Sequence, residues 1–244
     1  MPSWELHQSV GQRVYSRPLG PLELGFYWDG QFQGTADTCQ ATEVQVQNHA
    51  MFSRSKVFQA WTRLKYMHPL LAARTMSLPV DDSTDETIHF VIEEERIRHH
   101  IPDEITFLSC SSAQEVLVFT VNIQNSSRLL SNDLLARLFI VTRTDASHLV
   151  HALTLVAHSI TDGIANMTIM RTFLHLIATP EVQFAVPLPC KLEERLQLAS
   201  AVEDLAPSSK QNISRQRWRN ATGQIIASQR QARISVGSSL PSDC

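Results

Sequence analysis

The chain has 244 residues, of which 43% are hydrophobic, and this length and composition suffice to bury a sizeable core. With 24 acidic and 21 basic residues the formal net charge is -3, so no general basic field favours nucleic acid or an anionic membrane as the main partner. The cysteines form no CxxC pair, which argues against a zinc ribbon or a thioredoxin-type motif. Without an export-signal pattern, or a window near the roughly 18 apolar residues of a membrane span, we expect a cytoplasmic protein with reduced thiols.

The first part of the chain alternates strand and helix patterns. We expect an extended segment at 1–21, strands at 24–29, 41–47, 70–77 and 87–92, and a helix from 53 to about 66. The helix is predicted because Val57, Trp61 and Leu64 recur at i, i+4 and i+7 and because Ser53 is a favourable N-cap.

The second part begins with a short helix expected at 112–122. Strand patterns at 134–143 and 148–157 are separated by only four residues, which predicts an antiparallel hairpin. A helix follows at 162–177, and its expected apolar face consists of Ile164, Met167, Met170, Phe173, Leu174 and Ile177. After a proline-marked connection at 180–189 we expect a short helix at 191–198 and a basic helix at 214–233. The pattern as a whole predicts an α+β fold with a mixed, largely antiparallel sheet flanked by helices.

The stretch 149–177 is expected to run from a buried strand through a tight turn into a helix, with His158 where the strand ends. A neutral imidazole can accept a proton at cellular pH, which makes His158 a candidate general base. Asp162 could orient His158 or organise the turn, Thr161 or Asp162 could cap the helix, and Gly163 permits backbone angles that a side chain forbids. The spacing alone equally fits an ordinary strand-ending histidine beside a capping aspartate.

Other chemistries are less well supported by the sequence. A metal site is disfavoured because His151 lies on the opposite strand face from His148 and His158. No GxSxG, Walker or GxGxxG motif occurs, so Ser159 is a poor nucleophile candidate and no nucleotide cradle is expected. We therefore expect neither a metal nor a bound cofactor.

Three segments in order carry a family resemblance: HSITDG at 158–163, MHPLLAAR at 67–74, and RWR at 217–219 followed by GSSLP at 237–241. Together they resemble the CoA-dependent acyltransferase superfamily, whose members have a chloramphenicol acetyltransferase-like fold. Within it the chain is most similar to fungal trichothecene O-acetyltransferase-like proteins and to peptide synthetase condensation domains. The resemblance implies an acyltransferase of secondary metabolism that moves an acyl group from acyl-CoA, as co-substrate, to a hydroxyl of a small molecule.

The resemblance also assigns roles to the motif residues. His158 would be the general base in a channel between two similar halves, Gly163 would leave room for the acyl donor, and Asp162 would brace the turn by pairing with an arginine. Arg74 is the nearest candidate, so an Asp162–Arg74 salt bridge is expected. Condensation domains often begin the motif with two histidines, whereas this chain has Ala157 at the first position, which favours the O-acyltransferase branch.

Members of this superfamily are about twice as long as the chain. The resemblance therefore implies an N-terminal acyltransferase-like half-domain at 1–180, and a linker and crossover helix at 181–244 that leads toward a second half. The apolar side of that helix (Trp218, Ile225, Ile226) would be open to self-association. The alternative is a catalytically incomplete fragment that acts as a binding or regulatory protein or has no function of its own.

Overall fold

The computed structural model describes residues 4–9, 12–33, 37–79, 86–125, 127–180 and 191–201. All of them belong to one compact unit, Met1–Leu205. The predicted basic helix at 214–233, and the predicted connection at 180–189 apart from its first residue, lie outside the described residues. No helix within these ranges is long and apolar enough to cross a membrane.

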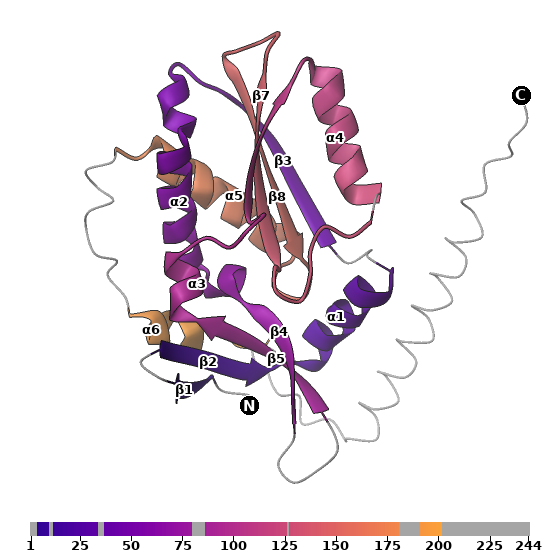
Figure 1. The fold of residues 1–244 in the computed structure, drawn as a ribbon, viewed down its shortest axis with the longest axis vertical. Coiled ribbons are helices and arrows are strands. Elements are labelled where there is room, and N and C mark those ends of the chain that lie inside the picture. Colours follow the sequence, from indigo (N-terminus) through magenta and orange to yellow (C-terminus); the bar gives the residue numbers. More distant parts are fainter. Residues whose placement is uncertain are drawn as a thin grey trace, which may run out of the picture. The chain divides into compact units, whose positions relative to one another are not determined.

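The larger of the two sheets positions the candidate histidine. Its strands lie in the order β3 (Asp37–Gln45), β8 (Leu149–Ala157), β7 (Ala136–Arg143) and β6 (Ile105–Cys110). β8 runs antiparallel to both of its neighbours, and β6 is parallel to β7. The predicted hairpin of β7 and β8 is confirmed, whereas β6 was not expected from the sequence. β8 is thus an interior strand (Figure 1), which explains its almost wholly apolar sequence.

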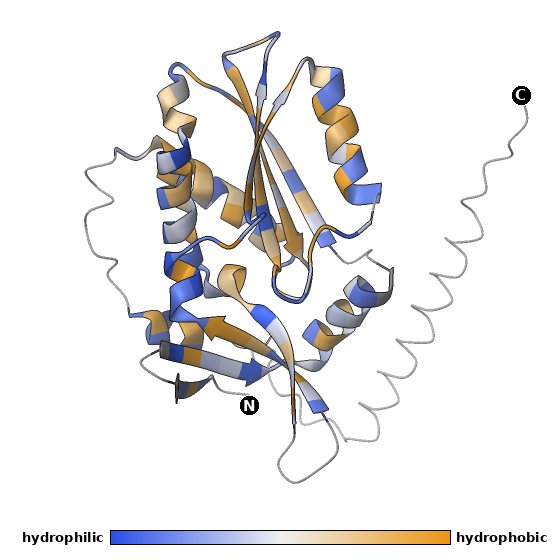
Figure 2. Cartoon of the chain, viewed as in Figure 1, coloured by the Kyte–Doolittle hydropathy of each residue, from blue (hydrophilic) through white to orange (hydrophobic). Residues whose placement is uncertain are grey.

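Helices cover both faces of this sheet. α2 (Arg54–Met67) packs beside α5 (Gly163–Ala178) on one face, and α4 (Ala113–Asn125) lies on the other (Figure 1). All three helices were predicted, and the expected stripe of α2 (Val57, Trp61, Leu64) is fully buried. Figure 2 shows the hydrophobic colouring of β7 and β8 between these helices, as expected for strands with a packed layer on each side.

A smaller antiparallel sheet lies beside the larger one. Its strands lie in the order β1 (Glu5–Ser9), β2 (Gln12–Pro18), β5 (Glu86–Glu93) and β4 (Arg74–Pro79). The remaining elements are α1 (Pro21–Gln33), α3 (Glu94–Arg98), α6 (Leu192–Gln197) and the 3₁₀ turns η1 (His49–Phe52) and η2 (Pro69–Ala72). The α+β class and the largely antiparallel pairing are confirmed, and the strands divide between two sheets.

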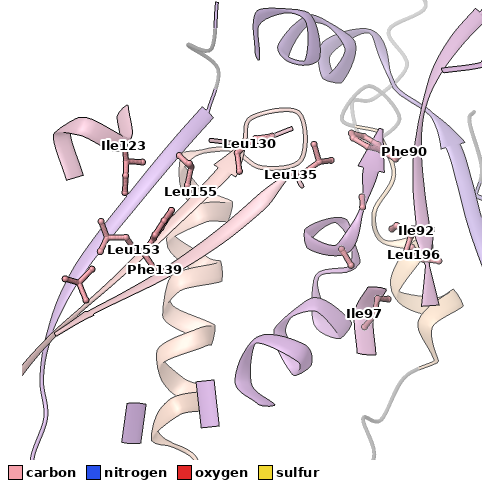
Figure 3. Packing of buried hydrophobic residues seen from close by; sticks show 14 of the residues in the cluster. Phe90, Ile92, Ile97, Ile123, Leu130, Leu135, Phe139, Leu153, Leu155 and Leu196 are labelled. Atoms are coloured by element: carbon pink, nitrogen blue, oxygen red, sulfur yellow. The ribbon is translucent and has the colours of Figure 1, made fainter. Parts of the chain in front are cut away.

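One hydrophobic cluster joins the two sheets. Leu153, Leu155 and Phe139 of the larger sheet belong to the same buried cluster as Phe90 and Ile92 of the smaller one (Figure 3). Alternate β8 residues point the other way, into a second cluster under α2 and α5. Both faces of β8 are therefore fixed by packing up to the residue before His158.

The strand expected at 24–29 is wrong, because these residues lie within α1. Pro21 occupies the first helical position, where its fixed φ and missing N–H are tolerated. The Glu23 carboxylate accepts the backbone N–H of Gly20 at 2.8 Å, the arrangement of a capping-box glutamate. Buried Arg17 donates two hydrogen bonds of 2.7 Å to the same carboxylate. These helix-start interactions override the strand preference of the aromatic run at 26–28.

The expected apolar face of α5 is partly wrong. Ile164 and Met167 are 78% and 62% exposed, whereas Ile169 and Leu176 are buried. The buried face is set by α2 and the larger sheet, which cover the side of α5 that carries Ile169, Phe173 and Leu176. The first two turns of the helix therefore present apolar side chains outward beside the His158 turn.

Candidate functional site

His158 lies directly beyond the last residue of β8, in the turn that leads to α5. The backbone N–H of Ile160 donates to the carbonyl of Ala157 at 3.0 Å, which closes the turn tightly. The imidazole is half-buried. Because β8 is packed on both faces, the position of the His158 backbone is fixed by the core.

One ring nitrogen of His158 is occupied by the turn itself. Nδ1 lies 2.7 Å from the carbonyl oxygen of Thr161. A carbonyl oxygen can only accept, so Nδ1 carries the hydrogen and the lone pair of the neutral ring is on Nε2. Among the described residues, Nε2 has no hydrogen-bond partner. In the neutral ring, the contact thus places the unprotonated nitrogen, which is the atom that a general base uses, at Nε2.

The ring of Phe26 lies flat against the His158 imidazole. The two ring centroids are 3.9 Å apart and the planes are 4° from parallel. Phe26 comes from α1, the helix that the sequence pattern predicted as a strand, so this contact could not be foreseen. Together with the Nδ1 hydrogen bond, the stack restricts rotation of the imidazole.

Asp162 caps α5 and does not contact the imidazole. Its carboxylate accepts the backbone N–H of Ala165 at 2.6 Å, which confirms the capping alternative. The expected salt bridge to Arg74 is not formed: Arg74 lies in the smaller sheet, where it pairs with Glu93 at 2.6 Å and approaches Asp133 at 4.0 Å. Strand pairing of β4 with β5 directs Arg74 to these partners.

Gly163 is the first residue of α5 and does not adopt a left-handed backbone angle. The expectation that it supplies an angle forbidden to other residues is therefore wrong. A Cβ built at Gly163 would meet nothing within 4 Å among the described residues. Space for an acyl donor beside it remains a prediction.

A buried network ties the first turn of α5 to the sheet. Thr154 donates to Asn166 Oδ1 at 3.0 Å, and Asn166 Nδ2 donates to the hydroxyl of Thr38 at 3.1 Å. Thr38 in turn donates to the carbonyl of Val156 at 3.0 Å. Thr154 and Asn166 are almost fully buried, so these bonds set the distance between the end of β8 and the start of α5. Thr154, a hydroxyl within an apolar strand, was the available sequence signal.

A second polar contact braces the neighbouring strand end. Asp37, which pairs in register with Ala157, accepts two hydrogen bonds from Arg128 at 2.8 and 3.0 Å. Arg128 also packs on Gly30 of α1, where a Cβ would lie 2.8 Å from the guanidinium. Gly30 thus permits α1, which carries Phe26, to lie close to the β3 end. This long-range pair has no sequence signal.

The histidines considered as metal ligands do not converge. His151 lies on the larger sheet, 3.6 Å from Glu43. Burial lowers the pKa of His151, and the opposing charge of Glu43 does not outweigh it. In the part of the chain that the structure describes, no three His, Cys, Asp or Glu side chains are placed to hold a metal ion.

Comparison with known proteins finds similarity at the level of structure. No family model matches the sequence, and no curated protein matches it. The chain is similar to TRI3 trichothecene 15-O-acetyltransferase from Fusarium sporotrichioides, with a TM-score of 0.57 and 16% identity over 80% of this chain and 42% of that one.

Condensation domains are similar as well. The condensation domain of the Monacolin K polyketide synthase MokA gives a TM-score of 0.51 with 11% identity over 87% of this chain and 41% of that one. The four-domain nonribosomal peptide synthetase AB3403 gives 0.56 with 15% identity over 91% of this chain and 15% of that one. The chain therefore spans less than half the length of these structures. The described residues thus share the fold of part of an acetyltransferase and of condensation domains.

Proposed function

We propose that the chain supplies the catalytic half of an acyltransferase that moves an acyl group from acyl-CoA to a hydroxyl of a small molecule, of the secondary-metabolite type. The observation that carries the proposal is the 2.7 Å contact between His158 Nδ1 and the Thr161 carbonyl, which leaves Nε2 free to accept a proton. The similarity to an acetyltransferase and to condensation domains supports the reaction class.

In the proposed step, Nε2 of His158 accepts the proton of the acceptor hydroxyl as its oxygen attacks the thioester carbonyl carbon. A carbon–oxygen bond forms, the carbon–sulfur bond breaks, and the departing CoA thiolate takes the proton back from Nε2. Phe26 and Thr161 hold the ring in one orientation throughout, which avoids a conformational cost at the moment of transfer. Asp162 and Gly163 act as parts of the turn, and Arg74 stabilises the smaller sheet.

A second protein surface would complete the channel, because the chain covers only 42% of the acetyltransferase that it resembles. The exposed Ile164 and Met167, next to the turn, are suited to apolar contact with that surface. Self-association is one way to supply it, and the predicted crossover helix remains the proposed contact.

The second candidate function is binding without turnover. This candidate is favoured by the partial coverage of the acetyltransferase, 42% of its length. A half-channel can bind a ligand near His158 without enclosing the thioester for reaction. In that case the chain acts as a binding or regulatory protein.

The test is release of free thiol from acetyl-CoA by the purified chain, with water and a panel of small alcohols as acceptors. His158→Ala is expected to lower the rate by about 10²–10⁴-fold, because that is the usual contribution of a general base. His148→Ala is the matched control, since His148 is exposed at the opposite end of the β7–β8 hairpin. Absence of wild-type turnover, or turnover that His158→Ala leaves intact, contradicts the enzyme proposal; binding of acetyl-CoA without turnover supports the second candidate.

A further inference from the structure

A cavity of about 390 Å³ opens beside the His158 turn, and no residue of α1 is in its lining. It lies between the end of α2 with η2, the first turns of α5, and the segment from α6 to residue 199. Its volume is within the range that holds small molecules. The lining consists of Met67, His68, Pro69, Leu70, Leu71, Ile160, Ala165, Thr168, Ile169, Arg195, Leu198 and Ala199.

This cavity is separate from the proposed base. Ile160 is the residue of the turn that lines it, whereas neither His158 nor Phe26 does so. A ligand in the cavity therefore occupies a different place from a hydroxyl on Nε2.

The wall formed by α6 is fastened to the smaller sheet. Tyr15 donates its hydroxyl to Glu193 at 2.8 Å, and Trp4 Nε1 and Arg17 Nε donate to the carbonyl of Ala199 at 3.2 and 3.1 Å. Burial and the hydrogen bond to the Glu193 carboxylate raise the pKa of Tyr15 to about 12, so the phenol remains a donor at neutral pH. The cavity wall is thus held in place by polar contacts from strand β2 and the segment before β1.

Within the described part of the chain, the cavity holds a cation without an anionic partner. Arg195 is partly buried, and no described carboxylate forms an ion pair with it or lines the cavity. His68 is the other titratable group in the lining, and burial followed by the nearby Arg195 charge lowers its pKa. The site therefore carries one positive charge, from Arg195, at neutral pH. A partly buried cation in apolar surroundings is stabilised by an anionic partner.

The rest of the lining fixes the shape of that partner. The apolar side chains in the wall are aliphatic, with leucine, isoleucine, methionine and alanine contributed by α2, η2, α5 and residues 198–199. Among the described lining residues there is no Phe, Tyr or Trp, and His68 carries the one aromatic ring. An aliphatic chain is the apolar group that these flexible side chains accommodate best.

We propose that this cavity is a binding site for a medium-chain aliphatic carboxylate, whose chain lies among Leu71, Ile169 and Leu198 and whose carboxylate pairs with Arg195. The inference does not depend on the proposed acyl transfer, because His158 takes no part in it.

The experiment is calorimetric titration of the full chain with octanoate and, separately, with octan-1-ol, which has the same chain without the charge. Octanoate should bind at least about tenfold more tightly than octan-1-ol, since a charge-assisted pair distinguishes the two. Arg195→Gln should remove that difference, whereas Arg171→Gln, on the exposed side of α5 and outside the lining, should preserve it. Thr168→Phe enlarges a lining residue that is otherwise exposed and should weaken both ligands while the fold is retained.

The proposal is overturned if octanoate does not bind at concentrations up to about 1 mM, which is a weak limit for specific binding. It is also overturned if octanoate and octan-1-ol bind with equal affinity, or if folded Arg195→Gln binds octanoate as tightly as the wild type. His158→Ala should bind octanoate as the wild type does. Octanoate affinity that disappears with His158→Ala places the ligand at the base instead and contradicts this site while leaving the acyltransferase proposal standing.

Discussion

Two polar centres of the molecule differ in how many of their hydrogen-bonding atoms have partners. In the first, Lys65 Nζ donates to the carbonyls of Arg96 and His99 at 2.6 and 2.8 Å and pairs with Glu104 at 2.9 Å, which uses all three ammonium hydrogens. Glu104 also accepts from Trp61 Nε1 at 2.7 Å. In the second, the His158 turn, Nδ1 is bonded to the Thr161 carbonyl, and Nε2 has no hydrogen-bond partner among the described residues. The saturated centre, in which Lys65 uses all its hydrogens, holds α2 to the end of α3. The His158 turn instead keeps a ring nitrogen that is available for chemistry.

The electrostatics of the saturated centre are consistent with a structural role. Burial acts to raise the pKa of Glu104, but hydrogen bonds from His100, Lys65 and Trp61 and the Lys65 charge outweigh it and hold that pKa below its ordinary value. Burial lowers the pKa of Lys65, and the Glu104 charge opposes that effect. Because Lys65 and Glu104 are almost inaccessible to solvent, each charge is compensated by the other and not by water.

The largest expected effect is on stability, from breaking the saturated centre. Lys65→Met leaves a buried, unpaired carboxylate and should lower the free energy of unfolding by about 3–5 kcal/mol. The double variant Lys65→Met/Glu104→Leu should recover much of that loss. Urea denaturation measures both, with Glu94→Gln as control, because its i,i+4 pair with exposed Arg98 contributes about 0.3–0.5 kcal/mol. If Lys65→Met lowered the free energy of unfolding only slightly, the Lys65–Glu104 centre would not have the structural role that distinguishes it from the His158 turn.

The same centre predicts the direction of the acid response. A carboxyl whose folded pKa lies below its unfolded value stabilises the fold above the unfolded value, near 4.3 for glutamate, and loses that contribution as the pH falls through the folded value. The wild-type free energy of unfolding should therefore decrease below about pH 4. The double variant should lack the Glu104 part of this decrease. If the free energy of unfolding decreases equally at acid pH in the wild type and the double variant, the decrease comes from other carboxyl groups.

The buried amide of Asn166 tests whether the network behind the His158 turn positions it. Asn166→Ala leaves the buried Thr154 hydroxyl without its acceptor, which should lower the free energy of unfolding by about 1–3 kcal/mol. The rate of thiol release should fall as well, because the start of α5 is no longer tied to the end of β8. Asn122→Ala, an exposed change on α4, is the control. Full activity in a destabilised Asn166→Ala would show that the network supports folding alone.

The smallest effect is expected from Phe26, which orients the ring. Phe26→Leu removes a stack of a kind that contributes about 0.5–1.5 kcal/mol, so we expect thiol release to slow by a factor of two to about ten. Phe119→Leu removes an aromatic pair with Phe139 away from His158 and should not change the rate. Equal rates for Phe26→Leu and the wild type would mean that the Thr161 hydrogen bond holds the ring by itself.

Local patterns in the sequence were sufficient for the core that carries the histidine. The apolar run of β8, the short connection to β7 and the periodicity of α2 and α5 each predicted the right element, because burial on both sides of a strand or on one stripe of a helix leaves a regular signal. The strand predicted at 24–29 was wrong because the helix there is stabilised by hydrogen bonds that the Glu23 carboxylate accepts from Gly20 and Arg17. The aromatic residues that follow have a strand preference, so the sequence pattern did not reveal these contacts.

The sequence by itself determined that a histidine follows a buried strand and that Thr161 or Asp162 stands where the next helix begins, because both depend on neighbours within a few residues. The structure then showed that Asp162 is the cap. The tertiary structure decided the tautomer of His158, the stacking of Phe26, the pairing of Arg74 with Glu93 in place of Asp162, and the cavity around Arg195. These features depend on which distant segments of the chain pack together, and the periodicity of the sequence does not indicate which segments do so.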